Sequence, residues 1–183
     1  EVHAWPILPK KEGYWFSGFC TKEAIDQLEQ YRGLKIKIDI EPPIPKKYTP
    51  LTAWTWIGKN CFQKPENTEY LKKKIKSLLR DTDIILSTFP LQKKILRNWG
   101  WIKDERLHYN FMFYSTFLPN GCKELYKLYF KKYFLPKHRD AYITVGLIGT
   151  GVFGNEPIYK NVKQMKKDIQ FLRKEKVETL VFF

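Results

Sequence analysis

The chain has 183 residues with a formal net charge of +14, and 43% of them are hydrophobic and 16% aromatic. This length and composition fit one folded domain with a substantial core and exclude an intrinsically disordered chain. Lysine supplies 27 of the 33 basic residues, whereas nucleic-acid recognition favours arginine, so we expect no nucleic-acid partner. The lysine- and isoleucine-rich composition fits a thermophile protein and an AT-rich genome equally well.

The sequence shows no sign of a metal site, a disulfide framework or a membrane span. The three cysteines are scattered, and no two of the three histidines have metal-ligand spacing. No apolar run reaches the roughly 18 residues of a membrane helix. We expect neither a metal nor a cofactor. The chain begins without methionine and stops in an apolar run, which favours a processed piece of a longer protein; an extracellular or cell-surface location fits such processing.

In chain order, the first elements lead to one strictly alternating strand. Residues 2–8 form a short apolar run that predicts a first strand, and an aromatic-rich loop follows at 10–18. Thr21 can cap a helix that ends near Arg32. Residues 34–41 then place leucine and isoleucines on one face and charged residues on the other, which predicts a strand.

The remaining chain continues to alternate between strands and helices. The proline-, threonine- and tryptophan-rich segment 42–66 is expected to be a long structured loop, and such loops are often functional. Apolar spacing then predicts helices at 68–80, 91–98, 121–133 and 161–174, and strands at 83–89, 107–115, 141–148 and 179–183. In the helix 121–133, Leu125, Leu128 and Tyr129 are expected to face the core.

Six predicted strands that alternate with five helices indicate a parallel sheet with right-handed crossovers. A complete eight-unit barrel needs about 250 residues. The sequence therefore predicts an α/β fold, an incomplete (β/α) TIM-type barrel of about six strands in a single domain spanning 1–183. An open sheet is the alternative.

Two carboxylates stand at the end of the alternating strand. Asp39 and Glu41 are two residues apart, so they point to the same side, at the end where barrel enzymes place their catalytic groups. A glutamate kept protonated beside an ionised aspartate can donate a proton to a leaving group. Alternatively, Lys35 or Lys37 pairs with these carboxylates in a structural ion network.

The motif Lys37-Ile-Asp39-Ile-Glu41-Pro-Pro resembles the second half of the Asp-x-x-Asp-x-Asp-x-Glu signature of chitinase-type family 18 glycoside hydrolases. That signature lies on the fourth strand of a (β/α)8 barrel. The resemblance implies that Glu41 is the general acid and that Asp39 orients the substrate's acetamido group in a retaining mechanism. The chain departs from the signature at Leu34 and Lys37, which replace aspartates.

A second motif, Phe111-Met112-Phe113-Tyr114, resembles the Met-x-Tyr that this family carries two strands later. The resemblance implies that Met112 contacts the substrate and that Tyr114 supports catalysis near the acetamido group. With these assignments, the six strands correspond to strands three to eight of the barrel.

Three tryptophans are placed to cover the flat apolar face of a sugar. Trp54 and Trp56 follow the carboxylate strand, and Trp5 lies in the first predicted strand. Each of them also fits a core or rim position.

Residues 149–154 read Gly-Thr-Gly-Val-Phe-Gly, which matches the dinucleotide-binding fingerprint. That fingerprint needs a helix that begins within the loop, whereas Asn155, Glu156 and Pro157 intervene here. In a barrel, the same loop would bring Asn155 and Glu156 close to a ligand.

The sequence therefore predicts a glycoside hydrolase-like barrel that acts on a polysaccharide or glycan. Its expected catalytic residues are Glu41, Asp39 and Tyr114, and its expected substrate-binding residues are Trp54, Trp56, Trp5, Asn155, Glu156, Lys37 and Met112. A non-catalytic carbohydrate-binding barrel, in which Lys37 has replaced an aspartate, is the first alternative, and an open-sheet nucleotide-binding protein is the second. The sequence gives neither the sugar nor the oligomeric state.

Overall fold

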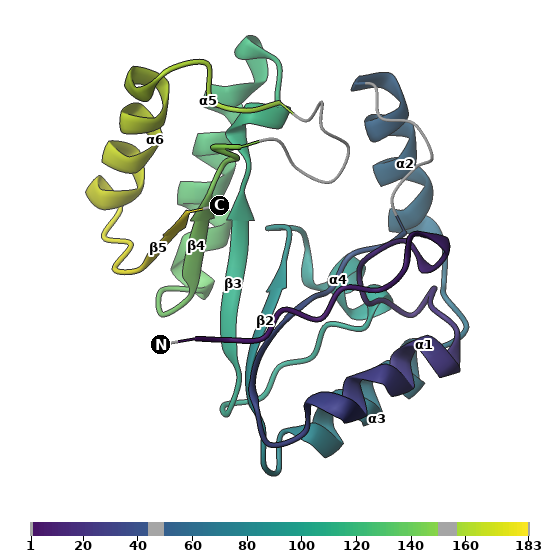
Figure 1. Ribbon diagram of the computed structural model, residues 1–183. Helices are drawn as coiled ribbons and strands as arrows, with labels where there is room; N and C mark the ends of the chain where they lie inside the picture. Colours follow the sequence, from purple (N-terminus) through teal and green to yellow (C-terminus); the bar gives the residue numbers. More distant parts are fainter. Residues whose placement is uncertain (1, 44–49, 150–156, 183) are drawn as a thin grey trace. The chain divides into compact units, whose positions relative to one another are not determined.

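The computed structural model describes residues 2–43, 50–149 and 157–182, apart from the side chains of residues 50–54, 57 and 120. The chain divides into two compact units, Glu1–His108 and Tyr109–Phe183. Both units are of mixed α/β type, with strands and helices in alternation (Figure 1).

The first unit is built around two parallel strands. Its elements are η1 (Lys10–Glu12), α1 (Lys22–Asp26), η2 (Gln27–Tyr31), β1 (Lys35–Asp39), α2 (Pro50–Phe62), α3 (Thr68–Leu78), β2 (Asp83–Thr88) and α4 (Lys93–Trp99). In the parallel pair β1–β2, Lys35 lies opposite Asp83 and Asp39 lies opposite Ser87. The expected alternation of β1 is confirmed, since its isoleucines Ile36 and Ile38 are fully buried.

The first helix begins and ends as its sequence predicts. The side chain of Thr21 accepts a hydrogen bond from the backbone N–H of Ala24 at 3.2 Å, which caps α1. Gly33 follows η2 with a φ of 78°, a left-handed conformation that glycine adopts without strain. This turn delivers the chain directly into β1.

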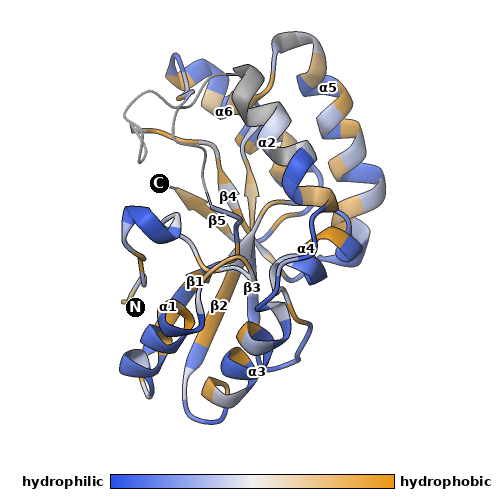
Figure 2. Cartoon of the chain, turned by 90° about the vertical axis from the view of Figure 1, so that its right-hand side faces the viewer, coloured by the Kyte–Doolittle hydropathy of each residue, from blue (hydrophilic) through white to orange (hydrophobic). Residues whose placement is uncertain are grey.

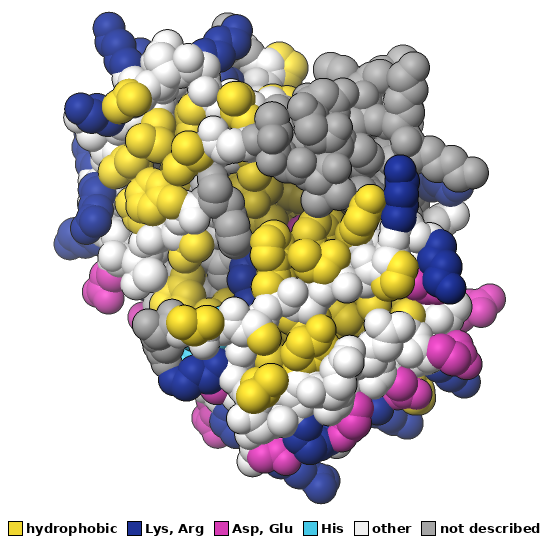
Figure 3. All heavy atoms as spheres, in the orientation of Figure 1, with side chains coloured by type: hydrophobic (Ala, Val, Ile, Leu, Met, Phe, Trp, Pro, Cys, Tyr) yellow, Lys and Arg dark blue, Asp and Glu magenta, His cyan; other side chains and the backbone are white. Residues whose placement is uncertain are grey.

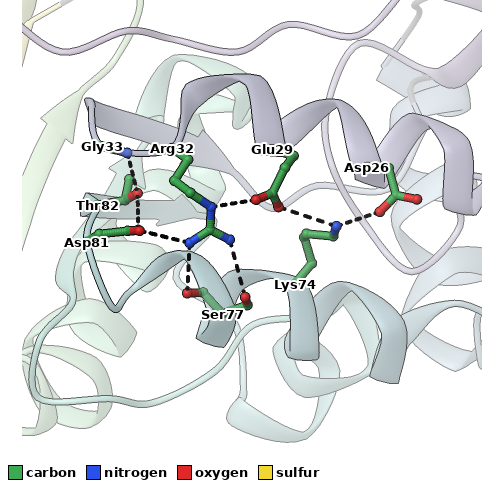
Figure 4. A network of polar contacts seen from close by, with 8 residues as sticks. All are labelled: Asp26, Glu29, Arg32, Gly33, Lys74, Ser77, Asp81 and Thr82. Carbon is green, nitrogen blue, oxygen red and sulfur yellow. Dashed lines mark hydrogen bonds and ion pairs between the residues drawn. The ribbon is translucent and has the colours of Figure 1, made fainter.

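Arg32 and Lys74 connect the first helices to α3 (Figure 4). The Arg32 guanidinium lies 3.0 Å from the Asp81 carboxylate. Lys74 Nζ lies 2.6 Å from Asp26 and 3.5 Å from Glu29. Partly exposed ion pairs of this kind contribute about 0–1 kcal/mol each, so their main effect is to fix the alignment of α1 and η2 against α3.

The second unit contains three parallel strands. Its elements are β3 (His108–Phe113), η3 (Ser115–Phe117), α5 (Asn120–Tyr129), a π-helical turn η4 (Phe130–Phe134), η5 (Leu135–Lys137), β4 (Tyr142–Val145), α6 (Val162–Lys174) and β5 (Leu180–Phe182). These strands pair in chain order, with Phe111 opposite Ile143 and Ile143 opposite Leu180.

The core of the second unit is strongly aromatic. The ring of Phe113 on β3 lies 5.0 Å from Tyr126, 4.8 Å from Phe130 and 5.7 Å from Phe171. The residues of α5 and η4 that pack inward are thus aromatic. The prediction that Leu125 and Leu128 face the core is wrong, because they are 69% and 44% exposed.

The parallel α/β pattern predicted from the sequence is confirmed, but the strand count is not. The described residues form five strands rather than six. The backbone of residues 2–8 pairs with β1 in a single parallel bridge, between Ala4 and Ile36. Pro6 lacks the N–H that a continuing ladder needs, which explains why the expected first strand stops at this bridge.

The prediction of a long loop at 42–66 is also wrong, since residues 50–62 form α2. Pro50 stands at the first helical position, where proline is favoured. The helix is held by tertiary contacts that local sequence does not reveal: Trp99 Nε1 donates to the carbonyl oxygen of Asn60 at 3.0 Å, and Trp56 Nε1 donates to that of Pro43.

Hydropathy follows this architecture along the helices. Figure 2 shows hydrophilic and hydrophobic residues in alternation along α3 and α5, as expected for helices with one face on a core. In Figure 3, basic and acidic side chains are interspersed, and hydrophobic side chains gather in several exposed groups.

Candidate active site at the end of strand β1

Lys37, Asp39 and Glu41 alternate with buried isoleucines and so share one side of β1 and its continuation. The backbone here is bonded on both edges. Phe16 N–H donates to the carbonyl oxygen of Asp39 at 3.1 Å, and Glu41 N–H donates to that of Phe16 at 3.1 Å. On the other edge, Ile40 N–H donates to the carbonyl oxygen of Ser87 at 2.7 Å. The two carboxylates therefore project from a fixed backbone.

Two donors from different parts of the chain bind the Asp39 carboxylate. Lys37 Nζ lies 2.6 Å from Asp39 Oδ1, and Trp5 Nε1 donates to Asp39 Oδ2 at 2.9 Å. The Lys37 ammonium also lies 4.5 Å from the centroid of the Trp5 ring, within the range of a cation–π interaction. Each oxygen of Asp39, which is only 3% exposed, thus has a donor, as a buried carboxylate anion requires.

Glu41 lies in a different environment although it is only two residues away. It is 6% exposed, and its carboxyl group accepts no hydrogen bond from the described residues. Burial raises the pKa of Glu41 well above its usual value, the negative charge of Asp39 raises it further, and Lys37 partly opposes both effects. Glu41 therefore keeps its proton to a higher pH than an ordinary glutamate.

A pair of stacked indoles borders this site. The rings of Trp5 and Trp15 lie 5.5 Å apart with an angle of 11° between their planes. Trp5 is 40% exposed, whereas Trp15 is 8% exposed. Trp15 was not among the residues predicted for the site, although the aromatic run at 14–16 is the signal that pointed to this loop.

The loop that carries Trp15 is packed against the chain that follows Glu41. A Cβ atom at Gly13, whose φ is 86°, would lie 2.5 Å from Pro43 Cα, so no larger residue fits there. Tyr14 has a φ of 67°, a left-handed backbone conformation that residues other than glycine rarely adopt. This left-handed turn directs the chain so that Trp15 meets Trp5.

The tryptophans predicted in the segment after β1 belong to α2. Trp56 is half-buried, and its indole N–H is bonded to the Pro43 carbonyl, so it anchors α2 to the chain just after Glu41. The side chain of Trp54 lies outside those described. Asn155 and Glu156 also lie outside the described residues, and their predicted contacts with a ligand stay predictions.

Met112 and Tyr114 belong to the second unit. Met112 is 3% exposed on β3. Tyr114 follows that strand, is half-buried, and lies 5.3 Å from Phe117 between ring centroids. The structure thus brings together Trp5, Lys37, Asp39 and Glu41 in the first unit, and places Met112 and Tyr114 at the end of β3 in the second.

A buried polar cluster follows Tyr114 and was not predicted. Asp168 on α6 accepts hydrogen bonds from Ser115 and, at 2.9 Å, from Tyr159, and lies 3.0 Å from Lys127 Nζ. Burial and the Asp168 charge raise the pKa of Tyr159. Because Asp168 is bonded to three side chains, we interpret the cluster as structural: it fixes the turn after β3 against α6. Its members are far apart in sequence, which is why periodicity could not identify it.

No family model, curated protein or solved structure matches the chain. The resemblance to family 18 glycoside hydrolases therefore rests on the motif residues. Within residues 2–43, 50–149 and 157–182, no group of three histidine, cysteine or acidic side chains is arranged to hold a metal ion. No helix among those described is long and apolar enough to cross a membrane.

The arrangement around Asp39 and Glu41 has defined chemical capabilities. Glu41 is a carboxylic acid whose proton is available at an unusually high pH, and Asp39 is an anion whose two oxygens have fixed donors. Partly exposed indole surface lies beside them. A buried neutral acid next to a fixed anion suits protonation of a leaving group and stabilisation of the positive charge that develops when that group departs.

Proposed function

We propose that this chain is a glycoside hydrolase-like protein of (β/α)-barrel type that acts on a glycan, with Glu41 as the general acid. The observation that carries this proposal is the pair of unlike carboxylates: Glu41 is buried with a raised pKa, two residues from Asp39, which is bonded to Lys37 and Trp5. A buried carboxylic acid with a raised pKa beside a second carboxylate is a recurring basis for acid catalysis.

In the proposed reaction, the Glu41 proton moves to the glycosidic oxygen as the bond between that oxygen and the anomeric carbon breaks. The resemblance implies that the substrate's own acetamido oxygen then bonds to the anomeric carbon. In the second step water attacks that carbon as its bond to the acetamido oxygen breaks, and the water gives a proton to the Glu41 carboxylate. This step restores both the acetamido group and the acid, with retained stereochemistry. Asp39 acts through its negative charge, which keeps Glu41 protonated and stabilises the cationic sugar.

The other predicted residues have supporting roles in this proposal. Trp5 would present apolar surface to the sugar ring, and the substrate contacts expected of Trp54, Met112 and Tyr114 stay predictions. Asn155 and Glu156 would supply polar contacts from the glycine-rich loop. Lys37 holds Asp39 rather than the substrate, because its ammonium is already engaged by that carboxylate.

The test is hydrolysis of a panel of N-acetylated and neutral glycans by the wild type and by Glu41→Gln. Loss of a general acid lowers kcat by about 10²–10⁴-fold, so we expect a decrease of this size for Glu41→Gln. Glu69→Gln, which changes an exposed glutamate of α3, serves as the matched control and should leave kcat unchanged. Equal activity of Glu41→Gln and wild type on every accepted glycan would exclude the assigned role.

One observation favours the binding-only alternative. Lys37 stands where the signature has an aspartate, and its ion pair with Asp39 occupies the carboxylate that would otherwise meet the substrate. A protein of this kind would hold a glycan without cutting it. Saturable glycan binding by the wild type with no released reducing ends would support this alternative over hydrolysis.

A further inference from the structure

Helix α5 and the following turn η4 carry two apolar faces. The inner face packs on β3, where Phe130 lies 4.8 Å from Phe113 and Phe134 lies 4.6 Å from Phe111 between ring centroids. The outer face of α5 consists of Cys122, Leu125, Leu128, Tyr129 and Tyr133. Orange bands recur along the visible length of α5 in Figure 2.

The outer face exposes large apolar side chains. Leu125 is 69% exposed, Leu128 is 44% exposed and Tyr133 is 62% exposed. The rings of Tyr129 and Tyr133 stack on one another with centroids 6.2 Å apart. A surface helix normally has one apolar face, on the core, and polar residues on the other. A second, exposed apolar face is typical of a site that binds another protein or a membrane.

The segment that carries the outer face is basic. Residues 120–134 contain Lys123, Lys127, Lys131 and Lys132 and a single acidic residue, Glu124. Lys127 and Lys131 are paired with Asp168 and Glu175.

Other basic side chains nearby are uncompensated. Lys123 and Lys132 form no ion pair with any described residue, and neither do Lys137 and Arg139, which follow η4. A second copy of the chain would bring these like charges together, whereas an anionic surface would neutralise them.

We propose that the outer face of α5 binds the surface of an anionic lipid bilayer, with the helix lying along the membrane–water boundary. Leucines of an interfacial helix enter the boundary of the acyl chains, and tyrosines settle at the level of the headgroups. The ammonium group of Lys132, which lies four residues after Leu128 and so on the same side of the helix, then reaches the lipid phosphates on its flexible stem. Leucine, tyrosine and lysine thus each occupy a position that suits their chemistry.

The experiment is flotation of the full chain with vesicles of phosphatidylcholine alone and with vesicles that contain 30 mol% phosphatidylglycerol. We expect at least tenfold more bound protein on the anionic vesicles, and a several-fold decrease in 0.5 M NaCl because the lipid charge is screened. The double variant Leu125→Gln/Leu128→Gln should lose this binding at least tenfold. Circular dichroism then verifies that the variant is folded.

Phe62→Gln is the matched control, because Phe62 is a 91% exposed apolar residue of α2 outside the outer face of α5. It should bind anionic vesicles as the wild type does. Equal binding to neutral and anionic vesicles, or full binding by the folded double variant, would overturn the proposal. The proposal would also be overturned if the wild type did not bind vesicles but formed a dimer in sedimentation equilibrium that depended on these leucines. The outer face would then be an interface between two copies of the chain.

Discussion

At the scale of single residues, Asp39 and Glu41 differ through their neighbours rather than their chemistry. The Asp39 carboxylate lies within 2.9 Å of an ammonium group and an indole N–H. The Glu41 carboxyl group is instead buried close to the negative charge of Asp39. The pairing of these carboxylates on one side of a strand could be predicted from alternation alone. The contact with Trp5 could not, because it joins residues 34 positions apart.

The raised pKa of Glu41 makes stability depend on pH. Because the folded-state pKa lies above the unfolded one, the contribution of neutral Glu41 to stability is complete below the unfolded pKa. It is lost as the pH rises through the folded pKa. Glu41→Gln cannot ionise, so its melting temperature should fall less between pH 5 and pH 9 than that of the wild type.

Thermal melts across this pH range provide the measurement, and each kcal/mol corresponds to about 2–4 °C for a chain of this size. Glu69→Gln is the control. Lys72 lowers the pKa of Glu69, so this variant should retain the wild-type loss of stability at high pH. Parallel curves for the wild type and Glu41→Gln would contradict the prediction.

Lys37→Met should destabilise the first unit, because it leaves Asp39 buried without its cation. Loss of one partner of a buried ion pair costs about 3–5 kcal/mol. Lys35→Met on the same strand changes a side chain that is 48% exposed and 3.9 Å from Asp83, so it should cost less than about 1 kcal/mol.

Urea unfolding of the wild type, Lys37→Met and Lys35→Met measures the free energy of unfolding that each substitution costs. Adding Asp39→Asn to Lys37→Met should recover part of the loss, since no charge is then left unpaired. A cost for Lys37→Met no larger than that for Lys35→Met would show that the ion pair is unimportant for stability.

At the scale of elements, the sequence predicts strands better than helix faces. The alternating isoleucines of β1 predict a strand with one apolar and one polar face, and this prediction does not depend on the strand's neighbours. In contrast, α2 depends on contacts made by Trp56 and Trp99, which no local pattern contains. In α5, leucines and aromatics compete for the core, and the phenylalanines of β3 pair with the aromatic side.

The inner face of η4 and the outer face of α5 should therefore differ in their effect on stability. Phe130→Ala removes a fully buried ring and should lower the free energy of unfolding by about 3–5 kcal/mol. Leu125→Ala, on the outer face of α5, should change it by less than about 0.5 kcal/mol. Chemical denaturation of both variants measures these values, and similar costs would mean that the outer face is covered in solution.

At the scale of the whole molecule, charge is abundant but spread along the chain. Acidic side chains pair with some of the 33 basic residues between elements, as in the network that joins Asp26, Glu29, Lys74 and Arg32 (Figure 4). Figure 3 shows basic side chains interspersed with acidic and hydrophobic ones. Composition could predict the excess of charge but not its distribution, because distribution depends on tertiary structure.

The division into two units gives the chain an uneven set of natural fluorophores. All six tryptophans lie between residues 5 and 101, within the unit Glu1–His108, and the unit Tyr109–Phe183 contains none. Tryptophan emission during unfolding therefore reports on the first unit alone, whereas far-ultraviolet circular dichroism reports on both. Coincident transitions by the two probes would mean that the units melt as one cooperative body, and separated transitions would mean that each carries its own stability.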